Sequence, residues 1–298
     1  MSDDSQEERI TVQDHDKQPS IKLSIEDQHR LKCPPGISDF QRENLEKNAK
    51  KNWDLFYKRH GNRFFKKRYW TRREFAELFS DGQEGTDKRY LLEIGCGCGD
   101  FALPLLDNEP DKYDDDSLAH VSLAKDLFIY CCDISERAIE ILKSNDIYKR
   151  FETSRIRAFV GNLLDRDGIV SNLGTHKMNY ISLIFVLSAL DPRRMELAIE
   201  NISSLISPGG LVFFRDYAIY DEAMLRFNEK SKIQNQFYVR QDGTRAYFFT
   251  KSELIGLFSK ENFECDTIEY VRRETINSAS GKHLSRIFLQ AKFRKRTS

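Results

Sequence analysis

The stretch Leu91-Leu92-Glu93-Ile94-Gly95-Cys96-Gly97-Cys98-Gly99-Asp100 predicts a place where the main chain comes close to a ligand. Residues 90–94 form a short apolar run broken by one acid, which is typical of a buried strand. Three glycines then alternate with small residues, and residues 101–106 favour a helix. Because glycine has no Cβ, a strand, glycine turn and helix in this order leave room for a ligand at the start of the helix.

Three interpretations of this glycine turn remain open. A dinucleotide-binding fold requires G-x-G-x-x-G, but the spacing here is G-x-G-x-G and Asp100 occupies the position of the last glycine. A Glu two residues before the first glycine, followed by G-x-G-x-G, resembles the first motif of class I methyltransferases, which use S-adenosylmethionine (SAM). A glycine-rich turn that binds nothing is the third interpretation. The motif favours a methyltransferase.

The charge of the chain is balanced overall but unevenly distributed. Among the 298 residues, 47 Lys and Arg offset 47 Asp and Glu, and the hydrophobic share of 40% is enough for a core. Residues 47–73 contain eleven Lys or Arg and a single acid, Asp54. A local basic face is sufficient to attract a polyanion, so binding of nucleic acid stays open although the net charge is zero.

The cysteines and the apolar runs restrict the class of protein further. Four of the six cysteines stand in C-x-C and C-C pairs, which predicts free thiols in the reducing cytoplasm or, alternatively, the nucleus. Neither spacing matches a zinc site, so we predict no metal. The chain has no apolar run long enough to span a membrane. Its acidic N-terminus does not resemble a signal peptide.

The sequence divides into three parts. Residues 1–36 are polar and acidic and predict a disordered leader. Residues 37–80 predict a helical segment rich in bases and aromatics, with one exposed helix over 38–51 and another over 72–79. Residues 87–298 predict the main domain, with a hydrophilic, acidic surface insertion at 108–125 and a helix and hairpin at 218–250 on the substrate side.

The segment at 52–73 mixes aromatic and basic residues, and two interpretations remain. Its aromatic residues could dock an amphipathic segment on the domain, leaving the bases solvated. Alternatively, the segment is a lid whose aromatics cover a ligand and whose bases meet phosphate. The bases in question are Lys58, Arg59, Lys66, Lys67, Arg68, Arg72 and Arg73.

The order of elements in the main domain predicts the fold class. Five predicted strands alternate with helical segments at 135–143 and 192–206. Four of them lie at 90–94, 127–132, 157–161 and 211–214, and the apolar run at 179–190 contains the central strand and the start of the next loop. A helix over 218–227, a hairpin over 237–249 and a helix capped by Thr250 follow. Strands at 265–273 and 283–293 close the chain. This order predicts an α/β, Rossmann-like fold with a seven-stranded, mostly parallel sheet and an antiparallel edge.

Polar residues follow several of these strands, at the sheet edge where open α/β folds bind ligands. Asp133 follows the second strand, where a carboxylate can accept hydrogen bonds from both ribose hydroxyls, although it can also cap the next helix. Asn162 follows the third strand and offers an amide oxygen to an adenine amine. The fifth strand ends in Arg215-Asp216-Tyr217, where apolar residues would be the default.

Five segments together resemble one family, the eukaryotic tRNA N3-methylcytidine methyltransferases. They are Asn52-Trp53-Asp54-Leu55-Phe56-Tyr57, Phe64-Phe65-Lys66-Lys67-Arg68-Tyr69-Trp70, Ile184-Phe185-Val186-Leu187-Ser188-Ala189, Phe214-Arg215-Asp216-Tyr217 and residues 237–249. The resemblance covers residues 38–295 except the acidic insertion. The wording of residues 52–59 and 71–75 is most similar to the branch that acts on serine tRNAs.

This resemblance implies an enzyme that transfers a methyl group from SAM to N3 of a cytosine in the anticodon loop of serine tRNA. It implies seryl-tRNA synthetase as a partner, and we expect a monomer when the protein is alone. The implied cofactor-binding residues are Trp53, Tyr57, Gly95, Gly97, Gly99, Asp133, Asn162, Leu163 and Ile184. Asn162 departs from the family, which has an aspartate there, and the insertion at 108–125 is a second departure.

The acceptor side gives a hypothesis for catalysis. A carboxylate near the exocyclic amine of cytosine would stabilise the positive charge that grows during transfer, which makes Asp216 the catalytic candidate and Tyr217 a wall for the base. Alternatively, Asp216 only pairs with Arg215. Substrate-binding candidates are Lys58, Arg59, Lys66, Lys67, Arg68, Arg215 and Arg240. Two rival functions are methylation of another RNA, a protein or a small molecule, and a partner subunit that has lost catalysis.

Overall fold

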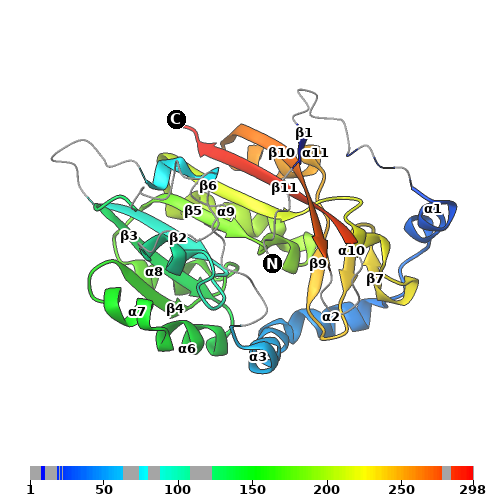
Figure 1. Cartoon of the computed structure of the whole chain (residues 1–298), viewed down its shortest axis with the longest axis horizontal. Coiled ribbons are helices and arrows are strands. Elements are labelled where there is room, and N and C mark those ends of the chain that lie inside the picture. The colour runs from blue at the N-terminus through cyan, green and yellow to red at the C-terminus, as the bar shows by residue number, and fades with distance from the viewer. Residues whose placement is uncertain are drawn as a thin grey trace.

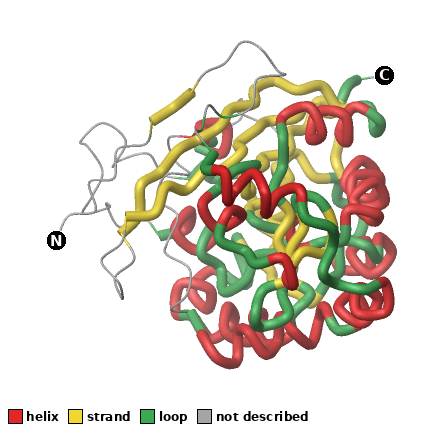
Figure 2. The backbone as a smooth tube through the Cα atoms, turned by 90° about the vertical axis from the view of Figure 1, so that its right-hand side faces the viewer, coloured by secondary structure: helices red, strands yellow, loops and turns green. Residues whose placement is uncertain are grey.

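A computed structural model describes residues 8–10, 19, 21, 23–62, 74–79, 88–107, 123–276 and 283–297, and it places a central sheet between layers of helices (Figures 1 and 2). The strands of this sheet are β1 (Glu8–Ile10), β2 (Arg89–Ile94), β3 (Leu127–Asp133), β4 (Ile156–Val160), β5 (Met178–Ile184), β6 (Ile206–Tyr217), β10 (Phe263–Ile276) and β11 (His283–Lys295). A second, small sheet contains β7 (Lys232–Gln234), β8 (Phe237–Val239) and β9 (Arg245–Tyr247).

The helices fall into three groups along the chain. The N-terminal group is α1 (Ile25–Lys32), α2 (Asp39–Lys47) and α3 (Ala49–His60). The helices that pack on the central sheet are α5 (Ala102–Leu106), α6 (Glu136–Ser144), α7 (Asp146–Phe151), α8 (Arg166–Leu173), α9 (Met195–Leu205) and α11 (Lys251–Ser259). Shorter turns are α10 (Glu222–Leu225) and the 3-10 helices η1 (Ala76–Leu78), η2 (Leu187–Ala189), η3 (Pro192–Arg194) and η4 (Glu229–Ser231).

The central sheet has the order β1-β10-β11-β6-β5-β2-β3-β4. Strands β2 to β6 pair in parallel, whereas β11 and β10 add an antiparallel edge next to β6. The predicted seven-stranded, mostly parallel sheet is therefore confirmed, and the short β1 adds an eighth strand against β10. Because the chain order reverses between β2 and β5, the carboxyl ends of these strands form the crevice in which open α/β sheets bind ligands.

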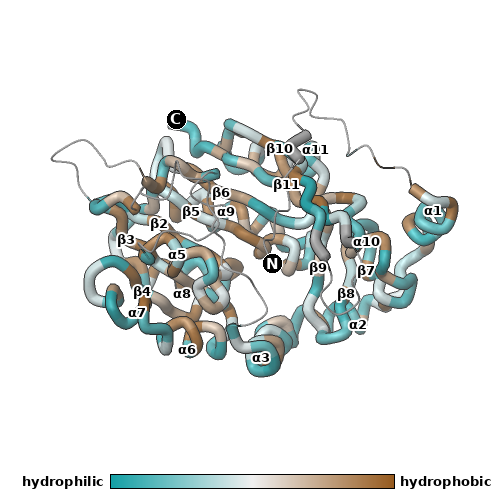
Figure 3. The backbone as a smooth tube through the Cα atoms, in the orientation of Figure 1, coloured by the Kyte–Doolittle hydropathy of each residue, from teal (hydrophilic) through white to brown (hydrophobic). Residues whose placement is uncertain are grey.

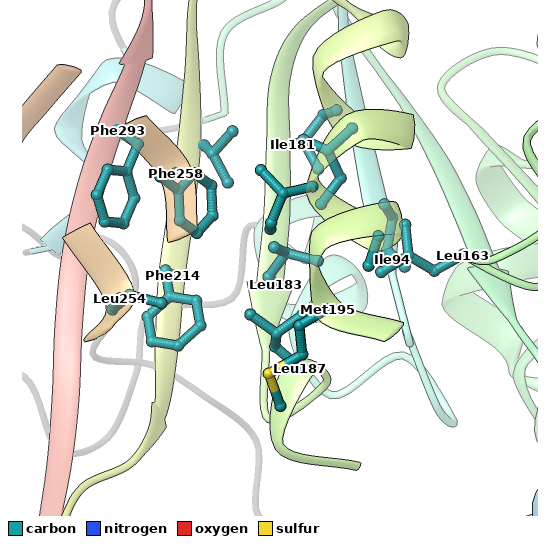
Figure 4. Close-up of a cluster of buried hydrophobic side chains, with 14 of the residues drawn as sticks. Ile94, Leu163, Ile181, Leu183, Leu187, Met195, Phe214, Leu254, Phe258 and Phe293 are labelled. Carbon is teal, nitrogen blue, oxygen red and sulfur yellow. The ribbon is translucent and has the colours of Figure 1, made fainter. Parts of the chain in front are cut away.

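Alternating side chains of the strands build two cores, one on each face of the sheet. In β6, Val212 and Phe214 pack with α9 and α11 on one face, while Leu211 and Phe213 pack on the other face with α5 and α6. Figure 4 shows Phe214 beside Leu254 of α11, and Leu183 beside Met195 of α9. Figure 3 shows that the buried strand β3 is mostly hydrophobic, whereas the N-terminal helix α2 is mostly hydrophilic. The period of two in each strand thus produces the layers.

Two predicted helices are shorter than the sequence indicated. Only Glu222–Leu225 is helical within residues 218–227, because Ala218 pairs with Phe249 and Tyr220 has a left-handed φ of 66°. Of the predicted helix over 72–79, residues 72 and 73 lie outside the described part of the chain, and residues 76–78 form a 3-10 turn rather than an α-helix. Both predictions are wrong because tertiary contacts decide the backbone: Phe75 and Leu78 are fully buried in the core.

The expected disorder of the leader is wrong for its last part. Ser24 caps α1 in a capping box with Asp27, and the helix ends at Lys32. The buried ammonium of Lys232 donates to the carbonyl oxygens of Leu31 (2.7 Å) and Cys33 (2.6 Å) at the end of the helix. Because that end carries the negative pole of the helix dipole, these bonds fix α1 on the small sheet. The insertion at 108–125 falls outside the described residues except for 123–125.

Among the described residues, no helix is long and apolar enough to cross a membrane. All six cysteines are free thiols, as predicted.

The turn predicted at 241–244 is present between β8 and β9, and Thr250 forms the predicted capping box with Glu253 at the start of α11.

A buried carboxylate attaches α2 to the main domain. Arg42 of α2 donates to both oxygens of Asp191 at 2.6 Å, and Arg193 also donates to both oxygens. Burial by itself would raise the pKa of Asp191, but the hydrogen bonds from the two guanidinium groups outweigh burial and lower that pKa. Asp191 directly follows the segment after β5, so the α2 helix is fixed beside the crevice.

We expect Arg42→Met to lower the free energy of unfolding by about 2 kcal/mol at pH 7, since a buried carboxylate loses one of two charged partners. The lowered pKa means that the contribution of Asp191 is present above the unfolded pKa near 4 and is lost as the pH falls below it. Urea unfolding at pH 7 and pH 3 measures both effects. Arg166→Met, at an exposed ion pair, is the matched control and should change stability by less than about 0.5 kcal/mol. A difference of equal size at both pH values would contradict this explanation.

Candidate active site

An open cavity of about 810 Å³, counting the solvent space at its mouth, lies at the carboxyl ends of the parallel strands. Helix α3, the glycine turn and the segments after β3, β4 and β5 form its walls. Eight of the nine predicted cofactor-binding residues line it: Trp53, Tyr57, Gly95, Gly97, Asp133, Asn162, Leu163 and Ile184. The topology of the sheet therefore brings together residues that are up to 131 positions apart in sequence.

The glycine turn forms the floor of the cavity and needs glycine at two positions. Gly95 and Gly97 have left-handed φ angles of 65° and 54°. A Cβ at Gly95 would lie 2.4 Å from Cγ2 of Val186, and a Cβ at Gly97 would lie 2.6 Å from the hydroxyl oxygen of Tyr57. The turn can thus be approached closely only because these side chains are absent.

Gly99 has a different place from the one predicted. It is not among the residues that line the cavity, and a Cβ there would lie 2.5 Å from Cδ1 of Leu142 and 2.8 Å from Cγ of Leu103. Its φ of 89° also requires glycine. Gly99 therefore permits α5 and α6 to pack against the turn, and it does not contact a ligand in the cavity.

Asp133 holds the glycine turn and faces the cavity with the same carboxylate. Its Oδ2 accepts from the Gly97 N–H at 2.9 Å, and its Oδ1 accepts from the Ser135 N–H at 2.9 Å. Burial raises the pKa of Asp133 to about 6, against the opposing effect of these two backbone hydrogen bonds. Each oxygen retains a second lone pair, so the carboxylate can still accept hydrogen bonds from two hydroxyl groups of a ligand.

Helix α3 covers one side of the cavity with aromatic rings. Trp53 and Tyr57 line the cavity, and Phe56 packs edge to face with both rings at centroid distances of 5.2 Å. Tyr57 is 5% exposed, and burial followed by the charge of Asp133 raises its pKa well above the ordinary value. The phenol is therefore neutral, and its hydroxyl lies beside Gly97 of the glycine turn.

The Asn162 side chain stabilises a turn and also lines the cavity. Its Oδ1 accepts from the Leu164 N–H at 3.0 Å, which stabilises the turn after β4. The amide still lines the cavity next to Leu163, so its NH2 group and the second lone pair of its oxygen remain for a ligand. Ile184, 3% exposed, ends β5 and supplies an apolar part of the wall.

Sequence reasoning missed several residues of the cavity: Asp100, Phe185, Val186, Leu190 and Arg245. Phe185 has a left-handed φ of 60°, which is costly for an aromatic residue and is typical of functional sites. No pattern in the sequence marks that conformation. Residues 185–189 belong to a segment that resembles the family, and this resemblance is a signal for the lining by Phe185 and Val186, whereas no sequence pattern marks Arg245.

A wall of aromatic and arginine side chains extends from the cavity. The Phe185 ring lies 5.1 Å from the Tyr217 ring and 5.4 Å from the Phe288 ring, measured between centroids. The guanidinium carbons of Arg240 and Arg286 lie 5.5 Å and 5.6 Å from the centroid of Tyr217. Since Phe185 belongs to both the cavity and this wall, a flat acceptor placed on the wall would adjoin a donor in the cavity.

Asp216 lies behind the wall rather than on its surface. It is fully buried, its Oδ2 accepts from the Ser188 N–H at 2.9 Å, and its Oδ1 accepts from the Tyr217 N–H at 2.9 Å. Burial raises its pKa to about 6, opposed by the hydrogen bonds from Ser188. Asp216 does not line the cavity, so this arrangement favours positioning of the 185–190 segment over the direct contact with substrate that the sequence predicted.

The alternative in which Asp216 pairs only with Arg215 does not describe these contacts. Adjacent strand residues point to opposite faces of a sheet, and Arg215 donates to Oε1 of Gln290 at 2.9 Å. Its guanidinium carbon lies 5.1 Å from the Phe288 ring centroid, and the residue is only 2% exposed. The prediction that Arg215 binds substrate therefore lacks an accessible guanidinium in this structure.

The other predicted RNA-binding residues fall in three places. Lys58 and Arg59 are exposed at the end of α3, next to the aromatic residues that cover the cavity. Arg240 is half-buried on the Tyr217 ring and donates to the carbonyl oxygen of Arg245 at 2.8 Å. Lys66, Lys67 and Arg68 lie outside the described residues.

Within the described part of the chain, three side chains that could hold a metal ion converge away from the cavity. Cys33 Sγ lies 3.7 Å from His29 Nδ1 and 3.1 Å from Glu229 Oε1. Its hydrogen bond to Glu229 raises the pKa of the Cys33 thiol, so the thiol acts as a donor there. The predicted absence of a metal site is therefore not tested by these three residues.

The cavity fits SAM. A glycine turn that admits main-chain contact, a carboxylate beside it and aromatic cover suit an amino-acid chain, a ribose and a flat base. The sheet order, with its antiparallel edge, is that of the class I methyltransferases. Fold and site together define this protein as a SAM-dependent methyltransferase of class I.

Comparisons with known proteins agree and give the family. A model described as a methyltransferase domain matches residues 57–268. Human tRNA N(3)-cytidine methyltransferase METTL6 is 43% identical over 92% of this chain and 90% of its own. METTL2 of Drosophila melanogaster is 37% identical over 86% and 74%, and trm141 of Schizosaccharomyces pombe is 36% identical over 87% and 97%. The chain belongs to the tRNA N3-cytidine methyltransferase family.

Solved structures confirm the fold. A SAM-dependent methyltransferase from Anabaena variabilis superposes with a TM-score of 0.52 at 16% identity, over 93% of this chain and all of the other. At this level of identity the likeness is one of fold alone.

Proposed function

We propose that this enzyme methylates N3 of a cytosine in the anticodon loop of tRNA, with serine tRNAs as its substrates. The observation that supports this most directly is the position of Phe185, which belongs both to the SAM cavity and to the wall formed with Tyr217 and Phe288. A cytosine lifted out of its stack would lie on this wall, with N3 facing the cavity. The family to which the chain belongs agrees with this acceptor.

The main task of the protein in this reaction is to align the acceptor nitrogen with the methyl group, because proton transfer is not required. SAM supplies an electrophilic methyl group on a sulfonium. Cytosine N3 carries a lone pair and no proton, so no strong general base is needed. The aromatic wall holds the base at a fixed depth, and the Ile184 side chain keeps water from the adjacent part of the cavity. The half-buried Arg240 guanidinium lies over the Tyr217 ring and would meet a flanking phosphate of a lifted base, whereas Arg286 already forms an ion pair with the buried Asp221.

Asp216 supports this site through the backbone. Its carboxylate fixes the Ser188 N–H, and Ser188 lies in the segment that supplies Phe185, Val186 and Leu190 to the cavity. We therefore assign Asp216 as a positioning residue. Tyr217 remains the residue of this pair that would touch the base.

We expect Asp216→Asn to weaken SAM binding and to lower the methyl-transfer rate together, each by about tenfold or more, since a charged hydrogen bond contributes about 1.5–3 kcal/mol. Calorimetry with S-adenosylhomocysteine and a single-turnover methylation assay measure the two effects. Asp146→Asn, an exposed carboxylate on α7, is the control and should change neither. Unchanged affinity with a lost rate would return Asp216 to the direct catalytic role.

The alternative acceptors remain as outcomes of the same assay. Purified protein and SAM would be mixed with serine and threonine tRNAs, each with and without seryl-tRNA synthetase, and the nucleosides analysed by mass spectrometry. We expect N3-methylcytidine on serine tRNA, more of it when the synthetase is present. Product on threonine tRNA alone would contradict the serine assignment. Absence of product from every tRNA, with SAM still bound, would favour another acceptor or a subunit without catalysis.

We further propose that the protein acts as a monomer associated with seryl-tRNA synthetase, in the cytoplasm and also in the nucleus. Six free thiols support a reducing compartment. Fractionation of cells that express the tagged chain, followed by pull-down of the synthetase, tests both parts.

A further inference from the structure

One arginine of the cofactor cavity has its charge balanced by a residue outside it. Arg245 of β9 is 4% exposed and lines the cavity. Its Nη1 donates to Oε2 of Glu46, near the end of α2. The Glu46 side chain is 22% exposed, so this ion pair joins a buried guanidinium to the edge of the solvent. A buried charge needs such a partner, and removal of either one is costly.

The Glu46–Arg245 pair stands where α2 passes into α3. Ala49, which begins α3, lines the cavity, and Trp53 and Tyr57 continue that lining along the helix. Two further contacts hold α3 on opposite sides of the cavity. The Asn52 side chain donates to the carbonyl oxygen of Gly243 at 3.0 Å, and the Ser135 hydroxyl donates to Asp54 at 2.6 Å. Residues 39–60, which we name the α2–α3 segment, therefore bridge the two sides of the cavity.

The same hairpin also reaches the aromatic wall. The carbonyl oxygen of Arg245 accepts from Nη1 of Arg240, and the Arg240 guanidinium lies over the Tyr217 ring. A shift of β9 would therefore move the side chains at the cavity and at the wall together. Figure 1 shows β9 extending down toward α2, while α3 lies between α2 and α6.

We propose that Arg245 and Glu46 are a positioning pair that holds the α2–α3 segment over bound SAM, so that cofactor binding and the placement of the exposed Lys58 and Arg59 are coupled. Lys58 and Arg59 belong to the last turn of α3, and a helix moves as a unit. The SAM part stands on the cavity alone, and the coupling to RNA rests on the proposed function. Because coupling between two ligands is reciprocal, bound cofactor should strengthen tRNA binding by the same factor as tRNA strengthens cofactor binding.

The test begins with affinity for S-adenosylhomocysteine, measured by calorimetry on the full chain. We expect Arg245→Gln and Glu46→Gln each to weaken binding by about tenfold, and the double variant to be no weaker than either single variant. Because Nη1 of Arg194 also lies 3.8 Å from Oε1 of Glu46, the charge exchange Glu46→Arg with Arg245→Glu is made together with Arg194→Gln, and it should then recover most of the loss. Arg137→Gln, at an exposed Arg–Glu pair on α6, is the matched control and should change affinity by less than about twofold.

Two outcomes of this measurement would overturn the pair. Unchanged affinity of Glu46→Gln would remove its partner role. Losses that simply add, with no recovery on charge exchange, would make Arg245 a direct cofactor contact instead. Thermal unfolding of every variant shows whether an affinity was lost through misfolding, and a variant that unfolds is replaced by Arg245→Lys, which keeps the charge and should retain most of the affinity.

A second measurement tests the coupling. Hydrogen exchange of α3 should slow in the wild type when S-adenosylhomocysteine is added, and it should slow much less in Arg245→Gln at a concentration that saturates the site. Serine tRNA should bind the wild type several-fold more tightly with S-adenosylhomocysteine than without it, and this gain should disappear in Arg245→Gln. A gain that persists in the variant would contradict coupling through this pair. No tRNA binding by the wild type would instead contradict the proposed function, and the calorimetric result would stand.

Discussion

Replacement of Asp133 by alanine is expected to weaken SAM binding by at least about 100-fold. Two hydrogen bonds from ribose hydroxyls to a carboxylate contribute about 1.5–3 kcal/mol each, and 1.4 kcal/mol corresponds to a factor of ten. The same change also removes the acceptor for the Gly97 N–H, so the glycine turn loses its support. Calorimetry at pH 8 measures the effect. Asp165→Ala, at the helix cap of α8, is the control for loss of a capping carboxylate and should leave SAM affinity within about threefold. An unaltered dissociation constant for Asp133→Ala would refute the ribose assignment.

The raised pKa of Asp133 adds a pH dependence to this prediction. Burial raises that pKa to about 6, so the wild-type carboxyl gains a proton as the pH falls from 7 to 5 and accepts hydrogen bonds less strongly. SAM affinity should fall over that interval, whereas Asp133→Asn, which has no proton to gain, should show a flat profile. The effect on stability has the opposite sign: because the folded pKa lies above the unfolded value near 4, the ionised group destabilises the fold progressively as the pH rises from 4 to 6.

The second large effect is expected at Gly99, where alanine should lower the free energy of unfolding by about 3 kcal/mol. A left-handed φ costs an L-residue about 1–2 kcal/mol, and a Cβ pressed against Leu142 and Leu103 adds about 1–3 kcal/mol. Thermal or urea unfolding measures the loss. SAM affinity of the folded fraction should change little, since Gly99 does not line the cavity.

Gly174 is the matched control for Gly99. Its φ is 67°, and a Cβ there would meet nothing within 4 Å. At this φ and a ψ of −130°, Gly174→Ala should therefore cost only the backbone part, about 1–2 kcal/mol. Equal losses at the two positions would show that the packing of α5 and α6 against the turn is not tight.

Local sequence pattern was enough to predict the order of the strands along the chain, the glycine turn and eight of the residues that line the cavity. Short apolar runs marked β2 to β6, and the residues after them, Asp133 and Asn162, fell at one sheet edge because the carboxyl ends of parallel strands lie together. The aromatic residues of α3 were predicted to line the cavity because residues 52–57 resemble the corresponding segment of the family. These features follow from short stretches of sequence, so they can be predicted without the tertiary structure.

Which polar residues face the cavity depends on contacts between distant parts of the chain. Asp216 follows an apolar strand just as Asp133 does, and backbone amides bind both oxygens of each carboxylate, yet Asp133 lines the cavity whereas Asp216 lies behind the wall. The left-handed Phe185 packs against Tyr217, which lies 32 positions later in the chain. The buried Arg245 pairs with Glu46, which lies 199 positions earlier. The side-chain direction at a strand end depends on what packs against it, and those partners come from distant parts of the chain. Long-range packing, which no local pattern encodes, therefore sets the side-chain and backbone angles of these residues.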